Sequence, residues 1–197
     1  NSNQVDYNGI CFDSTANKIV VVGRTTNNGY GVAAVGTVSG TSISFGSAAT
    51  FNSASTMYTS VSYDTNADKH VIAYRNSGNN HYGTAKVATV SGTSISFGSA
   101  VTFNSNQSDY ISIAYHPVAQ KHVLAYMTAS PIQGASIVGT VSGTSISFGS
   151  QVIFDSSNAY YETIVYHEAA QKMVLSYHNS SAYGVFRVGT VSGTSIS

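Results

Sequence analysis

The sequence predicts an all-β protein, a β-propeller of four-stranded antiparallel blades, and three observations support this fold class. The string Thr-Val-Ser-Gly-Thr-Ser-Ile-Ser occurs four times, and the residues between its copies also align. The copies lie 52, 51 and 50 residues apart, counted between their glycines, Gly40, Gly92, Gly143 and Gly193. Each unit contains four short stretches with strand character and none with a helical period. A four-stranded unit repeated about every 50 residues is typical of propeller blades.

The second unit illustrates the two strands expected nearest the propeller axis. Residues 58–63 predict the innermost strand, because Thr59, Val61 and Tyr63 share one face when side chains alternate with period two. Residues 71–75 predict the next strand, which is apolar on both faces and is therefore expected to be buried on both sides. The four residues Thr-Asn-Ala-Asp between these strands are turn formers.

The same unit shows why the two remaining strands are expected outside. Residues 84–90 are rich in β-branched side chains, as a third strand requires. In residues 93–97, Ile95 and Phe97 alternate with serines, so one side of this fourth strand faces water. Gly92 sits between the two strands and can adopt the positive φ that a two-residue hairpin turn needs.

The repeat divides the chain into four expected blades, with boundaries at 1–51, 52–103, 104–154 and 155–197. The fourth copy stops at Ser197 and lacks a segment such as Phe-Gly-Ser-Ala-Val-Thr-Phe, which completes the other three. The first copy starts at Asn1, where such a segment would end. These features favour a piece of a longer array of such units, and a closed four-bladed ring is the alternative.

Composition excludes several classes of partner. Charged residues make up only 8% of the chain, and eight Lys and Arg balance eight Asp and Glu. A surface that follows phosphates needs a concentrated excess of Lys and Arg, so we expect no nucleic-acid partner. No apolar run approaches the roughly 18 residues that span a bilayer, so we expect no membrane insertion. A polar surface of Ser, Thr and Asn favours an extracellular location or a virion surface.

The reactive side chains form no recognisable catalytic or metal motif. The single Cys11 rules out an internal disulfide framework and a thiolate-rich metal site. His116 and His167 stand where the first two units have Asp, which indicates substitutions next to a turn. His70 and His122 occupy a strand position that is apolar in the other units. Because the carboxylates are few and scattered, we predict no enzyme activity, no cofactor and no metal.

Variation among the units gathers at one end of the strands, where the second strand leads to the third and the fourth to the next unit. Loops on a rigid scaffold often carry binding residues, although loops also diverge wherever packing does not restrain them. Tyrosine rings offer flat apolar faces to sugars, and amide and guanidinium groups hydrogen-bond hydroxyls. The repeated Tyr-Gly pair has a structural alternative, a bulge with the ring packed over the strand end. The predicted contact residues are Arg24, Asn28, Tyr30, Arg75, Asn80, Tyr82, His178 and Tyr183.

Two strings support a resemblance to known repeats. Val-Gly-Thr-Val-Ser-Gly-Thr-Ser-Ile-Ser-Phe-Gly-Ser and Asp-Lys-His-Val-Ile-Ala-Tyr-Arg-Asn resemble the tandem blade-like repeats of tail-fibre and other virion proteins of marine phages, and of large extracellular proteins. The resemblance covers the whole chain and concerns a structural repeat. It implies a display or adhesion role and brings no site residues with it.

The sequence therefore favours a non-enzymatic structural or adhesion module of an extracellular filament or virion fibre. Its expected partners are other copies or neighbouring repeat units, and a glycan or surface protein at the variable loops. The alternative is a lectin-like glycan-binding propeller. A third hypothesis, a glycoside hydrolase, requires two acidic groups about 5–10 Å apart in a pocket.

Overall fold

The computed structural model describes residues 4–197 and is all-β, which confirms the fold class at that level. Residues 1–3, with which the first expected blade begins, lie outside the described range. No helix long and apolar enough to cross a membrane occurs among residues 4–197.

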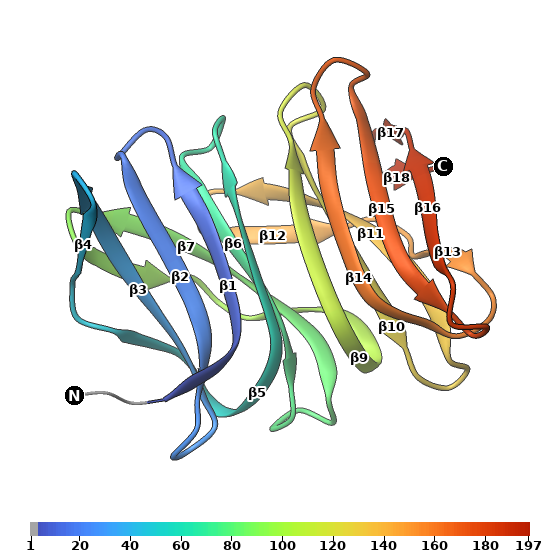
Figure 1. The fold of residues 1–197 in the computed structure, drawn as a ribbon, viewed down its shortest axis with the longest axis horizontal. Helices are drawn as coiled ribbons and strands as arrows, with labels where there is room; N and C mark the ends of the chain where they lie inside the picture. Colours follow the sequence, from blue (N-terminus) through green and yellow to red (C-terminus); the bar gives the residue numbers. More distant parts are fainter. Residues whose placement is uncertain (1–3) are drawn as a thin grey trace.

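The strands fall into four successive groups (Figure 1). The first contains β1 (Val5–Asp13), β2 (Lys18–Thr25), β3 (Tyr30–Ser39) and β4 (Ser42–Phe45). The second contains β5 (Ala49–Asp64), β6 (Lys69–Asn76), β7 (Tyr82–Ser91) and β8 (Ser94–Phe97). The third contains β9 (Val101–His116), β10 (Lys121–Thr128), β11 (Gln133–Ser142), β12 (Ser145–Phe148) and β13 (Val152–Asp155). The fourth contains β14 (Ala159–His167), β15 (Lys172–Asn179), β16 (Gly184–Gly189), β17 (Val191–Ser192) and β18 (Ser195–Ile196).

Each of the first three groups forms an antiparallel sheet whose outer strand is made of two pieces. In the first sheet, β4 pairs with one end of β3, with Ser39 opposite Ser42. The beginning of β5 pairs with the other end of β3, with Val32 opposite Thr50. The rest of β5 then becomes the inner strand of the second sheet. The fourth sheet has only β14, β15 and β16, and β17 pairs with β18 beside it.

The expected connections from one unit to the next are not loops in the second and third units. Residues 52–57 lie within β5, and residues 104–109 lie within β9. Their polar side chains suggested loops, but the backbone pairs across the ladder, as between Tyr30 and Ser55. Only the third connection is interrupted, between β13 and β14.

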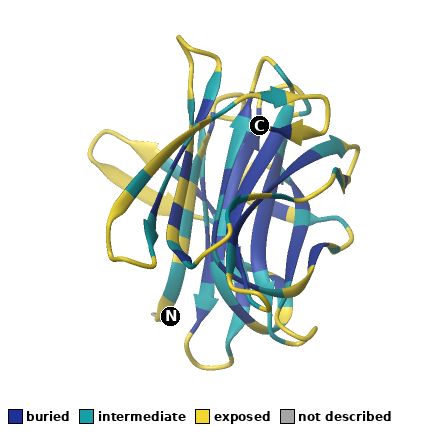
Figure 2. Ribbon diagram, turned by 90° about the vertical axis from the view of Figure 1, so that its right-hand side faces the viewer, coloured by how far each residue is buried: buried dark blue, intermediate teal, exposed yellow. Residues whose placement is uncertain are grey.

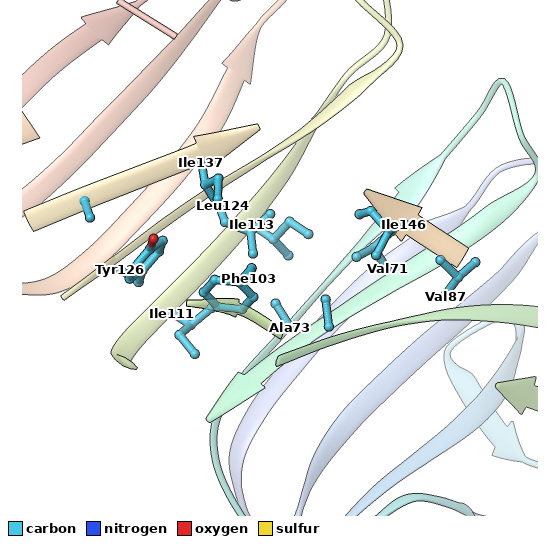
Figure 3. Packing of buried hydrophobic residues seen from close by; sticks show 12 residues of the cluster. Val71, Ala73, Val87, Phe103, Ile111, Ile113, Leu124, Tyr126, Ile137 and Ile146 are labelled. Atoms are coloured by element: carbon cyan, nitrogen blue, oxygen red, sulfur yellow. The ribbon is translucent and has the colours of Figure 1, made fainter. Parts of the chain in front are cut away.

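The core lies between the sheets, because each sheet packs against the next. Three apolar clusters fill these spaces, and Figure 3 shows the middle one, with Val71 and Val87 of the second sheet facing Leu124 and Ile137 of the third. The second strands of the second and third sheets are buried on both faces, as predicted, since residues 71–74 and 123–126 are fully buried. In the first and fourth sheets, β2 and β15 also contain partly exposed residues. Dark blue strands in the interior and yellow turns at the periphery show the same distribution in Figure 2.

Residues 4–197 do not close into a ring, so the four-bladed ring that the sequence left open is not formed by them. The first and last sheets lie at opposite sides of the molecule (Figure 1). Each leaves apolar side chains exposed, including Ile10 and Phe12 on the first sheet and Phe186 and Val188 on the last.

Buried Asp–His contacts link consecutive sheets at the turns between first and second strands. His70 Nε2 lies 3.6 Å from Asp13 Oδ2 of the preceding sheet, and His122 Nε2 lies 3.4 Å from Asp64 Oδ2. The sequence showed these histidines only at a strand position that is apolar in the other units, and it did not indicate these contacts. Where the turn carries His116 in place of Asp, the next sheet has Met173 at the histidine position, and His116 Nε2 lies 3.3 Å from Gln171 O instead.

The same acidic residues also hold the turns. Asp13 Oδ1 accepts a hydrogen bond from Ala16 N at 2.8 Å, and Asp64 Oδ1 accepts one from Ala67 N at 2.8 Å. In the third sheet His116 Nδ1 accepts the equivalent bond from Ala119 N at 3.1 Å. The aspartates and histidines at this position are thus alternative acceptors for the turn.

The buried histidines predict that acid destabilises the fold. Burial lowers the pKa of His70 from 6.5 to about 4, and burial also lowers the pKa of His122. Between these pKa values the unfolded chain binds more protons than the folded chain, so stability is present above about pH 6.5 and is lost as the pH falls toward 4. For His70 the loss is about 3 kcal/mol, at 1.36 kcal/mol per pKa unit. Denaturant unfolding at pH 7, 5.5 and 4 measures it.

His70→Met is the matched variant, because Met173 occupies the same position in the fourth sheet. It should reduce the dependence of the unfolding free energy on pH between 6.5 and 4. An unchanged slope in this variant would contradict the assignment to His70.

Candidate functional site

A row of four tyrosines marks the place where the inner strands of all four sheets come together. Tyr7, Tyr58, Tyr110 and Tyr161 each have a positive φ of 51–57°. Each lies at a register shift in the pairing of its inner strand with the next strand. A bulge re-aims the side chain at that point, which turns these rings toward their counterparts in the neighbouring sheets.

The four rings contact each other in sequence. The ring centroids of Tyr7 and Tyr58 are 5.1 Å apart, those of Tyr58 and Tyr110 are 5.0 Å apart, and those of Tyr110 and Tyr161 are 4.7 Å apart. These edge-on and tilted arrangements are the favourable ones for aromatic pairs. Burial raises the pKa of Tyr110 to about 12, so its hydroxyl remains a hydrogen-bond donor at neutral pH.

Cationic and imidazole side chains from the second strands lie against this row. The Cζ atom of Arg24 is 4.9 Å from the centre of the Tyr7 ring, and that of Arg75 is 5.0 Å from the centre of the Tyr58 ring. The His178 ring is 6.3 Å from that of Tyr161. Three of the residues predicted from sequence therefore belong to one cluster.

Two of the carboxylates at this place are held by the same arginines. Arg24 donates two hydrogen bonds to Asp6, Nε to Oδ1 at 2.8 Å and Nη2 to Oδ2 at 2.6 Å. Arg75 donates to Asp109 Oδ1, and Gln107 Nε2 donates to Asp109 Oδ2 at 2.7 Å. Asp109 is buried, whereas Asp6 is partly exposed. Both carboxylates therefore accept hydrogen bonds from a guanidinium group.

Glu162 has the opposite environment. Its side chain is 5% exposed, and neither carboxyl oxygen has a hydrogen-bond partner in the described part of the chain. Burial raises the pKa of Glu162 to about 8, and the negative charge of Asp109 adds to the rise. Glu162 is therefore mainly protonated at pH 7, and its carboxyl group can donate a proton.

A hollow of about 300 Å³ opens at the tyrosine row and is lined from all four inner strands. Tyr161 at its rim is 68% exposed, while Glu162 next to it is buried. Small-molecule sites combine apolar and aromatic walls with a few polar groups in this manner. We call this hollow the tyrosine site. Its lining residues are Tyr7, Asn8, Tyr58, Thr59, Tyr110, Ile111, Tyr161, Glu162 and Thr163.

The other predicted contact residues lie away from the tyrosine site. Tyr30 and Tyr82 begin the third strands and pair with the outer pieces at Ser55 and Gln107. Asn28 Oδ1 accepts the backbone N–H of Tyr30 at 3.0 Å, a bond internal to its turn. These positions belong to the outer part of the sheets.

The two remaining predicted residues are also in outer turns. Asn80 has a φ of 52° in the turn before β7. Tyr183 is 71% exposed and directly precedes β16. The five outer residues and the tyrosine site are thus separate groups.

The sequence contained a signal for the missed part of the site. Tyrosine is the first residue of the repeated Tyr-x-x-(Ile/Val) motif in all four units, but strand alternation alone gave it no special direction. Glu162 carried no signal, because Asn8, Thr59 and Ile111 occupy its position in the other units.

Other reactive groups do not form a second site of this kind. Burial raises the pKa of Cys11 to about 12, with a smaller contribution from Asp13, so the thiol is not ionised at neutral pH. Within residues 4–197, no three His, Cys, Asp or Glu side chains converge as metal ligands would. Ser62 Oγ lies 2.8 Å from His122 Nδ1, with Asp64 on the other side of the ring, but His122 is fully buried and cannot reach a substrate.

No protein-family model matches the sequence, and no curated protein matches it. Solved structures do resemble its fold. The exo-β-1,3-galactanase of Phanerochaete chrysosporium with β-1,3-galactotriose aligns with a TM-score of 0.67 and 14% identity, over 100% of this chain and 50% of its own. The same enzyme with galactose gives a TM-score of 0.66 and 13% identity, over 98% and 49%.

The NanB sialidase of Streptococcus pneumoniae aligns with a TM-score of 0.63 and 13% identity, over 94% of this chain and 31% of its own. The chain thus spans half or less of the length of these proteins. At such identities the likeness concerns the fold.

The expectation of a non-enzymatic structural or adhesion module is wrong. Solved structures that share the fold include a galactanase and a sialidase, which are enzymes that act on glycans. The carboxylates are scattered along the chain, but the fold brings Asp109 close enough to Glu162 for its charge to raise the pKa of that group. The resemblance to tail-fibre repeats stays a prediction.

The buried Arg75–Asp109 pair predicts an uneven response to substitution. Arg75→Met would leave the Asp109 carboxylate buried without its cation, which costs about 3–5 kcal/mol of unfolding free energy. Arg24→Met is the matched control: because Asp6 is partly exposed, the expected loss is at most about 1 kcal/mol.

Denaturant unfolding of both variants and of Arg75→Met/Asp109→Asn measures the difference. The double variant should recover part of the loss, because it removes the unpaired charge. Equal losses in the two single variants would contradict the assigned burial of the pair.

Proposed function

We propose that the chain is part of a β-propeller of four-stranded blades that binds glycans at the tyrosine site and hydrolyses a glycosidic bond there. The β-propeller folds of the similar galactanase and sialidase structures support the architecture. The order of strands within each sheet supports it as well, because the inner strands of successive sheets lie side by side.

One observation carries the proposed activity: the carboxyl group of Glu162, a lining residue of the tyrosine site, is buried without a hydrogen-bond partner among residues 4–197. Burial raises its pKa to about 8. A carboxylic acid whose pKa is raised by its surroundings protonates the leaving oxygen in glycoside hydrolysis. A glycosidic oxygen or sugar hydroxyl in the hollow would also supply the hydrogen-bond partner that Glu162 lacks.

Asp109 is the second carboxylate in this proposal. It lies near enough to Glu162 to raise the pKa of that group, and Arg75 and Gln107 donate hydrogen bonds to it. A fixed negative charge stabilises the oxocarbenium-like transition state of glycosidic cleavage. Two carboxyl groups with opposite environments are the arrangement from which acid and base roles are assigned.

Glycan binding without hydrolysis is the second candidate function, and the tyrosine row favours it. Tyr161 presents an exposed ring at the rim, and Tyr110 lies beside it. Sugar rings pack their C–H faces on such aromatic surfaces, and this requires no acid.

Hydrolysis of β-1,3-linked galacto-oligosaccharides and sialyl-oligosaccharides by the purified chain tests the proposal. Glu162→Gln should lower the rate by a factor of about 10²–10⁴ and leave glycan binding in place, because only the proton donor is lost. The rate should also decline as the pH rises through about 8, where Glu162 loses its proton. Glu168→Gln, in an exposed turn, is the matched control and should not change the rate.

The outcomes separate the two functions. Binding on a glycan array that Tyr161→Ala weakens, with no hydrolysis by the wild-type chain, would overturn the enzyme and retain the binding protein. Absence of both binding and hydrolysis would overturn the proposal.

A further inference from the structure

The fourth sheet has an unpaired outer edge where the other three sheets carry a strand. In those sheets the third strand pairs with an outer piece, and the register is the same each time: Gly31 opposite Asn52, Gly83 opposite Asn104 and Gly134 opposite Asp155. The corresponding third strand is β16, which begins at Gly184. Among residues 4–197, the only ladder partner of β16 is β15.

The glycines at this register hold phenylalanine rings. A Cβ atom at Gly31 would overlap the ring of Phe51, and the same holds for Gly83 and Phe103. Gly134 and Phe154 repeat the arrangement in the third sheet. Glycine is therefore required at these positions by the close approach of an aromatic ring from the outer piece.

Gly184 is the glycine at the same register of the fourth sheet, but no aromatic ring within residues 4–197 lies against it. A Cβ atom there would meet no other atom within 4 Å. Two residues along the same face, Phe186 is 75% exposed, although its counterparts Ala33 and Ala85 are 1% and 0% exposed. A groove of about 450 Å³ lies between the third and fourth sheets and reaches β16, and its lining includes Phe154, Ile164 and Phe186.

We propose that β16 is an acceptor edge for one more extended strand, which pairs antiparallel with it and seats a phenylalanine over Gly184. The partner is a strand of a further repeat unit, with a sequence such as Phe-Gly-Ser-Ala-Val-Thr-Phe-Asn. The three segments of this type in residues 4–197 are already paired with β3, β7 and β11. The occupant is therefore a segment other than these.

The register of the added strand follows from its internal counterparts. Asn104 lies opposite Gly83, and Val101 lies opposite Ala85, so the same sequence on β16 places its valine opposite Phe186. An aromatic residue opposite a β-branched one is a favourable cross-strand pair. Main-chain hydrogen bonds supply affinity in this mode of recognition, and side-chain pockets supply specificity.

A synthetic peptide with the sequence of residues 97–106 tests the proposal by isothermal titration calorimetry with the full chain. The wild-type chain should bind the peptide, and the β16 amides should gain protection from hydrogen exchange. A peptide with Ala in place of Phe103 should bind at least ten-fold more weakly, because it lacks the ring that would pack over Gly184.

Gly184→Val is the decisive variant of the chain. The valine side chain would occupy the space over Gly184 where the phenylalanine ring of the peptide is expected, so it should abolish peptide binding. The circular dichroism and Tm of the variant should match the wild type, because the space at Gly184 is open. Gly134→Val is the matched variant at a glycine that the Phe154 ring already covers. It should lower the Tm, because the valine side chain would overlap that ring.

Three results would overturn the proposal. These are no binding of the peptide by the wild-type chain, equal binding by folded Gly184→Val, and equal affinity for the peptide without Phe103. If Gly184→Val does not fold, the affinities of the two peptides for the wild-type chain still test the proposal. Neither measurement involves the tyrosine site, so failure here is distinct from failure of the proposed glycan activity.

Discussion

A single four-stranded sheet with two apolar faces cannot be stable in water, and this constraint governs the whole molecule. Each sheet buries its faces only against its neighbours, as the three inter-sheet clusters show. Close contact requires small residues at defined places. Gly83 admits the ring of Phe103, and that ring then packs against Tyr126 of the next sheet at 5.0 Å between centroids. The repeat sequence therefore encodes an interface as much as a strand pattern.

The same packing assembles the tyrosine site. Because inner strands of successive sheets lie side by side, residues about 50 positions apart become neighbours. The bulge in each strand adds the direction, since it turns Tyr58 and Tyr110 toward one another instead of along the sheet. Function can then arise from differences between units, and Glu162 is the clearest one: an acid stands where Thr59 and Ile111 stand elsewhere.

The first and last sheets expose apolar side chains whose counterparts in the inner sheets are buried. Val188 is 66% exposed, while its counterparts Val87 and Val138 are 1% and 0% exposed. Exposed apolar surface of this kind marks a place for interaction. In this molecule the internal copies of the interface indicate the partner, because the first three sheets all pair glycine and phenylalanine in the same register.

The sequence by itself determined the all-β class, the places of the second, third and fourth strands of the second unit to within two residues, and the turns at Gly92 and its equivalents. It could do so because side-chain alternation and turn chemistry are local properties. It also selected Arg75 and His178 as contact residues. It missed the strand in residues 52–57, since polar side chains concealed a backbone that pairs with another strand. Tertiary structure alone decided that Glu162 is buried near Asp109. Burial and proximity between residues 53 positions apart depend on how whole sheets stack, and no local pattern records that.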